Sequence, residues 1–127
     1  MMKQIKGWEK LRDFALSLDL PEIVETTSWG EPCLKAFGKN WTWWSPSAQC
    51  PVFKVDFDER EFLLENRLDT FFLTDHYRAH RLVLMRPDHF DAPWARDNLH
   101  RVWRAQAPKR FLKAWDSQGG GSDGGKD

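Results

Sequence analysis

The segment 52–57 constrains the fold more than any other part of the chain. Its side chains divide into two alternating sets, as they do along a β-strand: Phe53, Val55 and Phe57 on one side, and Val52, Lys54 and Asp56 on the other. Asp58 then provides an N-cap, with Glu61 three residues later as in a capping box, and Phe57 and Phe62 have the spacing of a hydrophobic staple. The sequence therefore predicts a strand that leads directly into a short helix at 59–66.

The N-terminal part of the chain predicts one helix followed by strands. Apolar residues recur at helical spacing over 5–18, and Pro21 ends this helix because the residue before a proline avoids the helical conformation. Extended segments follow at 22–27, 33–37 and 41–45. The last two are separated by Gly38-Lys39-Asn40, and three residues with Gly and Asn between apolar runs predict a hairpin.

The C-terminal part predicts one further strand and a pair of helices. A polar loop over 74–81 precedes an apolar strand at 82–86. Asp91 has the position of an N-cap for a long amphipathic helix, and Pro108 begins a further turn of helix. Since short turns join most strands, the fold class is α+β, with a mainly antiparallel sheet and helices packed on one face.

Tryptophan is unusually frequent, with eight in the chain, and three of them crowd the segment 41–45. In a regular strand Trp41 and Trp43 cannot face the same side as Trp44. At least one of the three is therefore expected on the sheet face away from the helices. Packing in the core is the simplest role for such side chains. Beside the cations Lys35, Lys39 and Lys54, an exposed tryptophan would instead be a stacking platform.

The composition predicts one domain at 1–116 and a disordered, Gly-rich tail at 117–127. Five of the eight glycines follow residue 118, and no apolar residue lies among them, so this segment cannot offset the entropy of ordering. The net charge is zero, with 19 basic and 19 acidic residues. Residues 76–115 nevertheless carry 9 basic and 3 acidic side chains, and such asymmetry points weakly to an anionic partner.

The start of the chain shows no apolar run of signal-peptide length, and no segment is long enough to span a membrane. A cytoplasmic location without membrane association is therefore expected. In that reducing compartment Cys33 and Cys50 are expected to be free thiols.

Several motifs are familiar in their order. They are E-T-T-S-W-G-E-P at 25–32, F-G-K at 37–39, V-F-K-V at 52–55, T-D-H-Y-R at 74–78 and A-P-K at 107–109. Taken together, these motifs resemble the MmcQ/YjbR-like family. The resemblance covers nearly all of residues 5–116. It implies a compact α+β fold of the double-wing, CyaY-like kind, and a DNA-binding role that rests on fold analogy. The crowded tryptophans at 41–45 depart from the common pattern of that family.

A basic surface is the first candidate for function. Arg96, His100 and Arg104 follow one another at i, i+4 and i+8, which places them in one row of a helix. A solvated helix face is the simplest interpretation, and a phosphate-contacting surface is the functional one. The candidate nucleic-acid-binding residues are Lys35, Lys54, Arg81, Arg96, Arg104, Lys109 and Arg110, with DNA as the partner.

An aromatic pocket is the alternative, in a module that binds a small ligand or a protein. Its candidate residues are Trp29, Trp43, His76 and Tyr77. An enzyme that uses His76 or a cysteine has the least support, because the sequence contains no nucleophile elbow, phosphate loop or paired carboxylates. His76 and His80 lack an obvious third ligand, so no metal and no cofactor are predicted.

Overall fold

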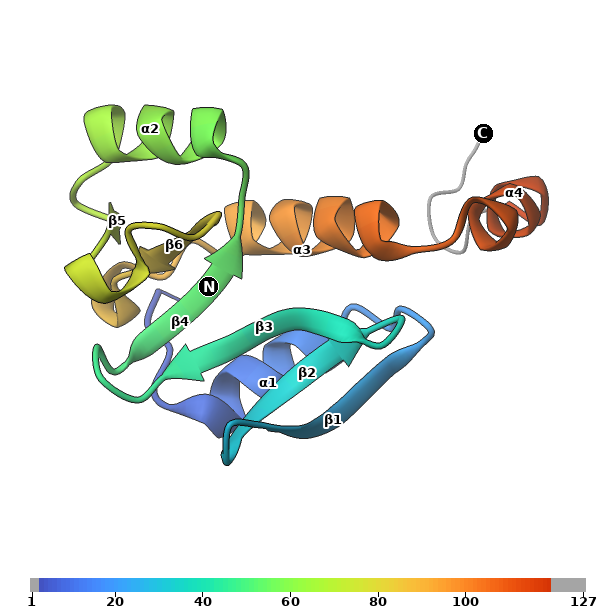
Figure 1. Cartoon of the computed structure of the whole chain (residues 1–127), viewed down its shortest axis with the longest axis horizontal. Helices are drawn as coiled ribbons and strands as arrows, with labels where there is room; N and C mark the ends of the chain where they lie inside the picture. Colours follow the sequence, from blue (N-terminus) through green and yellow to red (C-terminus); the bar gives the residue numbers. More distant parts are fainter. Residues whose placement is uncertain (1–2, 120–127) are drawn as a thin grey trace.

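The computed structural model describes residues 3–119, and in this range the chain forms an α+β fold (Figure 1). Six strands form one sheet in the order β1-β2-β3-β4-β6-β5, and every neighbouring pair is antiparallel. The strands are β1 (Ile23–Ser28), β2 (Glu31–Ala36), β3 (Lys39–Ser45), β4 (Cys50–Lys54), β5 (Phe71–Phe72) and β6 (Leu82–Met85). The predicted fold class is confirmed.

Four α-helices pack against this sheet. They are α1 (Trp8–Leu16), α2 (Phe57–Asn66), α3 (Ala92–Gln106) and α4 (Lys109–Ser117), and two short 3-10 helices, η1 (Asp75–Tyr77) and η2 (Pro87–His89), flank β6. Figure 1 shows α1 behind β2 and β3, and α2 beyond the β5–β6 edge. No helix within residues 3–119 combines the length and the apolar character that crossing a bilayer requires.

The two faces of the sheet differ in what covers them. The helical face carries the main core, in which Trp41 and Phe53 of the sheet pack with Leu11 of α1 and with Leu99 and Trp103 of α3. The opposite face, which we call the open face, carries a smaller cluster made of Cys50, Val52, Tyr77, Leu82 and Leu84. Since the segment around η1 covers only part of the open face, room remains on it for a pocket.

A bulge in β3 places the three tryptophans on sheet faces that differ from those predicted by regular alternation. Leu34 lies opposite Thr42 while Lys35 lies opposite Asn40, so Trp41 has no partner in β2. The extra residue turns Trp41 onto the helical face, where Trp44 also packs, and leaves Trp43 on the open face. The expectation that Trp41 and Trp43 share a side is therefore wrong, because a bulge interrupts the period of two.

The first two hairpins turn on two residues each. Trp29 and Gly30 join β1 to β2 with φ angles of 55° and 80°, and Phe37 and Gly38 join β2 to β3 with 56° and 80°. Left-handed backbone at both positions suits the right-handed twist of the strands. The predicted three-residue turn at 38–40 is therefore wrong, since β3 already begins at Lys39.

The helix after β4 begins two residues earlier than the sequence indicates. Asp56, in extended backbone, is the N-cap, and its Oδ1 accepts a 2.7 Å hydrogen bond from the Glu59 backbone N–H. Phe57 thus lies inside α2, and both Phe57 and Phe62 are exposed, so the predicted cap at Asp58 and the predicted staple are both wrong. The cap moves because the β4–β6 ladder ends at Lys54, which leaves Asp56 free to close the helix.

The end of the chain follows the prediction more closely. Asp91 caps α3 by accepting a 3.0 Å hydrogen bond from the Trp94 backbone N–H, and Pro108 directly precedes α4. Helix α4 packs Phe111 and Trp115 against Trp103. It extends to Ser117, one residue beyond the predicted domain boundary. Most of the predicted tail, at 120–127, lies outside the described residues.

Candidate functional site

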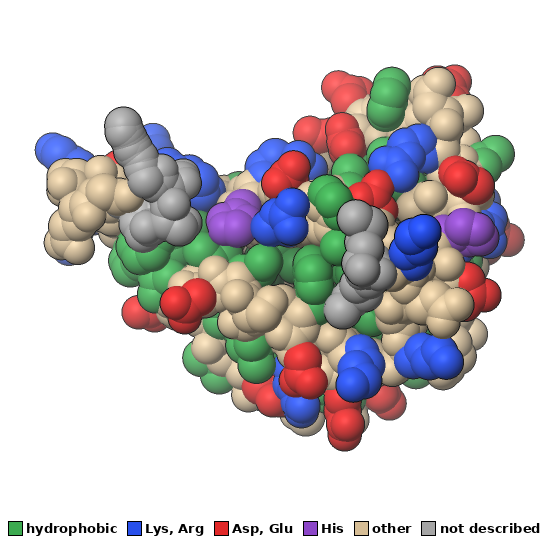
Figure 2. All heavy atoms as spheres, turned by 180° about the vertical axis from the view of Figure 1, so that it is seen from behind, with side chains coloured by type: hydrophobic (Ala, Val, Ile, Leu, Met, Phe, Trp, Pro, Cys, Tyr) green, Lys and Arg blue, Asp and Glu red, His purple; other side chains and the backbone are tan. Residues whose placement is uncertain are grey.

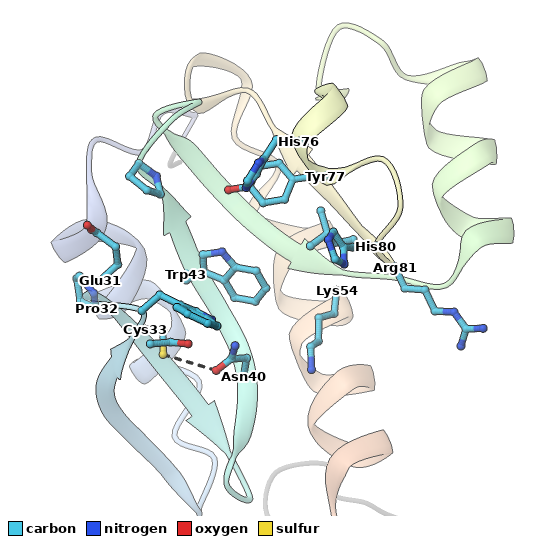
Figure 3. A pocket seen from close by; sticks show the side chains of 14 residues that line it. Glu31, Pro32, Cys33, Asn40, Trp43, Lys54, His76, Tyr77, His80 and Arg81 are labelled. Atoms are coloured by element: carbon cyan, nitrogen blue, oxygen red, sulfur yellow. Dashed lines mark hydrogen bonds between the residues drawn. The ribbon is translucent and has the colours of Figure 1, made fainter.

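A pocket of about 690 Å³ lies on the open face; we call it the aromatic pocket (Figure 3). Strands β2, β3 and β4 provide its floor with Cys33, Asn40, Trp43 and Lys54, and the β1–β2 turn provides one rim with Ser28 and Trp29. The segment after β5 provides the opposite wall, with His76, Tyr77, His80 and Arg81. The pocket is thus assembled from four separate stretches of chain, at 28–33, 40–46, Lys54 and 76–82.

Trp43 forms the centre of the floor, and its neighbour across the strand pair is Cys33. The bulge at Trp41 also brings Asn40 onto this side, where Asn40 Oδ1 accepts a 3.8 Å hydrogen bond from Cys33 Sγ. The amide N–H groups of Asn40 have no hydrogen-bond partner within residues 3–119. They are therefore available to a ligand on the floor.

The wall is held in place by hydrogen bonds to buried groups. Tyr77 is buried, and its hydroxyl donates a 2.8 Å hydrogen bond to Ser45 Oγ at the end of β3. Arg60 of α2 donates from Nη1 to the backbone carbonyl oxygens of Arg78 and His80, at 3.0 and 2.8 Å. The His76 ring meets the Tyr77 ring edge to face, with ring centroids 4.7 Å apart. These contacts form the wall before any ligand arrives.

Cations gather on one side of the aromatic pocket. Lys54, His80 and Arg81 lie together there, whereas Glu31, which is the one carboxylate lining the described pocket, lies on the far side (Figure 3). Burial lowers the pKa of Lys54, and the nearby charge of Lys39 lowers that pKa further. The Arg81 guanidinium points away from the cavity and lies over the Phe57 ring, 5.3 Å from its centroid, so Lys54 brings the positive charge to this side of the cavity (Figure 3).

Trp29 has two unusual features at the rim. Its side chain is fully exposed, and its backbone is left-handed, which is uncommon for a bulky residue. A large apolar side chain in solvent contributes nothing to the core. The left-handed backbone belongs to the hairpin turn, and the exposed side chain borders the aromatic pocket.

The seven predicted nucleic-acid-binding residues belong to two regions, the open face of the sheet and the exposed surface of α3 and α4. Lys54 and Arg81 line the aromatic pocket, and Lys35 projects from β2 to the same face because its neighbours Leu34 and Ala36 belong to the helical-face core. Arg96 and Arg104 lie on the exposed side of α3. Lys109 and Arg110 begin α4, on the exposed surface.

The predicted row of basic residues on α3, made of Arg96, His100 and Arg104, does not form a uniformly positive surface. Arg104 makes two hydrogen bonds with the carboxylate of Asp116, at 3.0 and 2.9 Å. In the view from behind, lysine and arginine side chains alternate with aspartate and glutamate (Figure 2). The cations of α3 and α4 are therefore interspersed with carboxylates, and Arg104 is paired with one of them.

The four predicted ligand-binding residues, in contrast, come together. Trp29, Trp43, His76 and Tyr77 all line the aromatic pocket. Sequence reasoning assigned Lys54 and Arg81 to a nucleic-acid surface, and it gave no role to Asn40. No local signal could have found Asn40, because its position on the open face depends on the bulge in β3.

The geometry adds no support for a cysteine nucleophile, or for a metal site among the described residues. Burial raises the pKa of Cys33, although Lys35 opposes this, and it raises the pKa of Cys50 to about 12. A thiol with a raised pKa is a poor nucleophile at neutral pH. Across the described range, His, Cys, Asp and Glu do not gather into any group of three or more that could hold a metal.

Comparisons with known proteins return no match to this chain, whether with family models, curated proteins or solved structures.

Proposed function

We propose that this protein is a binding module for a small molecule, and that the aromatic pocket is its site. One observation carries the proposal: the four aromatic residues singled out in the sequence line one cavity of about 690 Å³. This volume falls within the range typical of small-molecule sites. An apolar lining with few convergent polar groups is also typical of such sites.

The chemistry of the lining favours a ligand with a flat, largely apolar body. Trp43 offers an indole on the floor, Tyr77 borders the wall, and Trp29 stands at the rim. Aromatic rings bind other flat rings through stacked or edge-to-face contacts. Trp29 is fully exposed. A ligand that covers it would remove its apolar surface from water, and this burial favours binding.

Preorganisation also supports the proposal. The Tyr77–Ser45 hydrogen bond and the two bonds from Arg60 hold the wall, so little side-chain and loop freedom remains to be lost on binding. Lower ordering costs leave more of the contact energy as affinity.

DNA binding, which the resemblance to the MmcQ/YjbR-like family implies, has less support. The candidate cations belong partly to the aromatic pocket and partly to the exposed surface of α3 and α4, and Arg104 already pairs with Asp116. Phosphate-driven binding needs several cations along one surface. DNA binding stays a prediction, and a titration with duplex DNA at low salt is its test.

A matched pair of adjacent tryptophans tests the small-molecule proposal. Trp43 lies on the open face and Trp44 packs against the helical-face core. Fused-ring aromatic probes, screened by ligand-observed NMR and measured by isothermal titration calorimetry, are expected to bind the wild-type protein. Trp43→Ser should weaken this binding roughly tenfold or more, since stacking on an aromatic side chain contributes about 1–3 kcal/mol.

Trp44→Phe is the control, and it should leave probe affinity unchanged. The proposal is overturned if no probe in the set binds, or if Trp43→Ser binds the probes as tightly as the wild type does. Tight binding of duplex DNA combined with no binding of aromatic probes would favour the nucleic-acid alternative instead.

A further inference from the structure

We propose that the ligand of the aromatic pocket carries an oxyanion, a carboxylate or a phosphate, and that Lys54 binds this group while the flat body of the ligand covers Trp43. The inference rests on the proposed ligand-binding function and adds the chemical class of the ligand. Four features of the pocket carry it: the position of Lys54, the charges around it, the polar groups beside it, and the contrast between the charged end and the apolar end of the lining.

Lys54 is the last residue of β4, and its side chain is held inside the pocket edge. Its Nζ donates a 2.9 Å hydrogen bond to Gln106 Oε1 at the end of α3. The Gln106 amide nitrogen is in turn fixed by the backbone carbonyl oxygens of Ala36 and Lys39, at 2.9 and 3.3 Å. The ammonium group therefore has a defined position, and two of its three N–H donors remain for a ligand.

The surroundings of Lys54 are short of negative charge. Every element packed around it presents a cation or a neutral group: Lys39 from β3, His80 and Arg81 from the wall, and Gln106, Asn98 and Arg101 from α3. Among residues 3–119, no carboxylate lies within ion-pair distance of Lys54. A half-buried ammonium without a counter-charge is costly, and an anionic ligand would offset this cost.

Polar groups beside Lys54 suit an oxyanion. The free amide N–H groups of Asn40 lie across the floor from Lys54, whose ammonium group points away from the His80 ring (Figure 3). Charge-assisted hydrogen bonds to such donors are about twice as strong as neutral ones. Away from this end, the lining passes to Trp43, Tyr77 and Pro46, which offer apolar surface. The pocket therefore matches a ligand with one charged end and one flat apolar end.

Binding of such an anion should depend on pH in a definite direction. Because burial and Lys39 lower the pKa of Lys54, its ammonium loses the proton at a lower pH than an ordinary lysine. A bound anion favours the charged form and raises this pKa again. Affinity for an anionic probe should therefore fall as the pH rises above neutral through the lowered pKa of Lys54, whereas affinity for a neutral probe should not follow this change.

Three probes with the same ring system provide the test: naphthalene-2-carboxylate, 2-naphthyl phosphate and the uncharged naphthalene-2-carboxamide. Calorimetric titration of the full chain at pH 7 and low salt should show at least one anion binding roughly tenfold tighter than the carboxamide, as expected for a hydrogen-bonded charge at a partly buried site. Whichever anion binds more tightly identifies the oxyanion that the site prefers.

Two lysine variants test whether Lys54 causes the preference for anionic probes. Lys54→Met should abolish the preference for the anion and leave carboxamide affinity nearly unchanged. Lys35→Met is the matched control, because Lys35 lies on the same face outside the pocket lining, and it should keep the preference. If Lys54→Met does not fold, the pH dependence of the wild type gives the answer by itself.

The possible results separate the two proposals. Equal affinity for all three probes would overturn the oxyanion inference and leave the small-molecule function standing. A preference for anions that survives Lys54→Met, or that does not fall as the pH rises to 10.5, the ordinary pKa of a lysine, would also overturn the assignment to Lys54. Failure of all three probes and of the wider aromatic set to bind would overturn the proposed function itself.

Discussion

Arg60 in α2 donates a 2.8 Å hydrogen bond from Nη1 to the backbone carbonyl oxygen of His80. The same atom donates to the carbonyl oxygen of Arg78 at 3.0 Å, and the guanidinium lies over the Phe57 ring, 4.9 Å from its centroid. Arg60 is 7% exposed, so a nearly buried cation joins α2 to the wall of the aromatic pocket.

Arg60→Met should therefore loosen this wall and destabilise the fold. It leaves two backbone carbonyls without their charged donor, which we expect to lower the free energy of unfolding by roughly 2–3 kcal/mol. Urea denaturation measures the loss, and amide hydrogen exchange over residues 77–82 should become faster. Arg78→Met is the control, because its ion pair with Asp75 is exposed and should change stability by less than about 1 kcal/mol. Equal effects of the two variants would contradict this role for Arg60.

The position of the α2 cap can be tested with two aspartates in the same turn. Asp56→Ala removes the side-chain acceptor of the Glu59 N–H and should destabilise the protein by about 1 kcal/mol. Asp58→Ala removes only a favourable charge in the first turn of the helix, which is worth about 0.5 kcal/mol. Thermal and urea denaturation distinguish them. A larger loss for Asp58→Ala would restore the cap that the sequence indicated.

Trp41 is expected to contribute far more to stability than its neighbour Trp44. Its indole is fully buried, and Nε1 donates a 3.0 Å hydrogen bond to the Leu99 carbonyl oxygen, which ties β3 to α3. Trp41→Phe leaves a cavity and removes this bond, so we expect a loss of roughly 2–3 kcal/mol. Trp44→Phe, at a half-buried position, should cost about 1 kcal/mol or less. Denaturant titration measures the loss of stability in both variants. A larger loss for Trp44→Phe than for Trp41→Phe would contradict the prediction.

Both cysteines should react slowly with alkylating reagents in the folded protein. Burial raises the pKa of Cys50 to about 12, so at pH 8 only about one molecule in 10⁴ carries its thiolate, which is the reactive form. The raised pKa of Cys33 acts in the same direction. Iodoacetamide labelling followed by mass spectrometry should show slow modification of both residues, and fast modification in concentrated urea. Rapid labelling of either cysteine in the native state would contradict this burial.

Local signals account for the elements that the sequence predicted well. Asp91 before the apolar period of α3, and Pro108 before α4, act through their own backbone and immediate neighbours. The alternation of β4 and the apolar run of β6 were also visible for this reason. The cap of α2 was misplaced because Asp56 and Asp58 are chemically equal candidates, and the point where β4 stops pairing with β6 decides between them.

The candidate site was predicted in part. The sequence predicts an aromatic pocket near Trp29, Trp43, His76 and Tyr77, and these residues line one cavity. Lys54 was assigned to a surface for nucleic acid, because the sequence does not show that Gln106, 52 residues away, holds its ammonium group at the pocket edge.

The sequence by itself determined the α+β class, the order of the main helices and strands without β5, and the aromatic character of the candidate site, since these depend on periodicity, capping residues and composition. Only the tertiary structure decided which face each side chain occupies. A single unpaired residue at Trp41 sends Trp43 and Asn40 to the open face, and the strand order brings the wall at 76–81 over them. These are consequences of long-range pairing, and no local pattern in the chain encodes them.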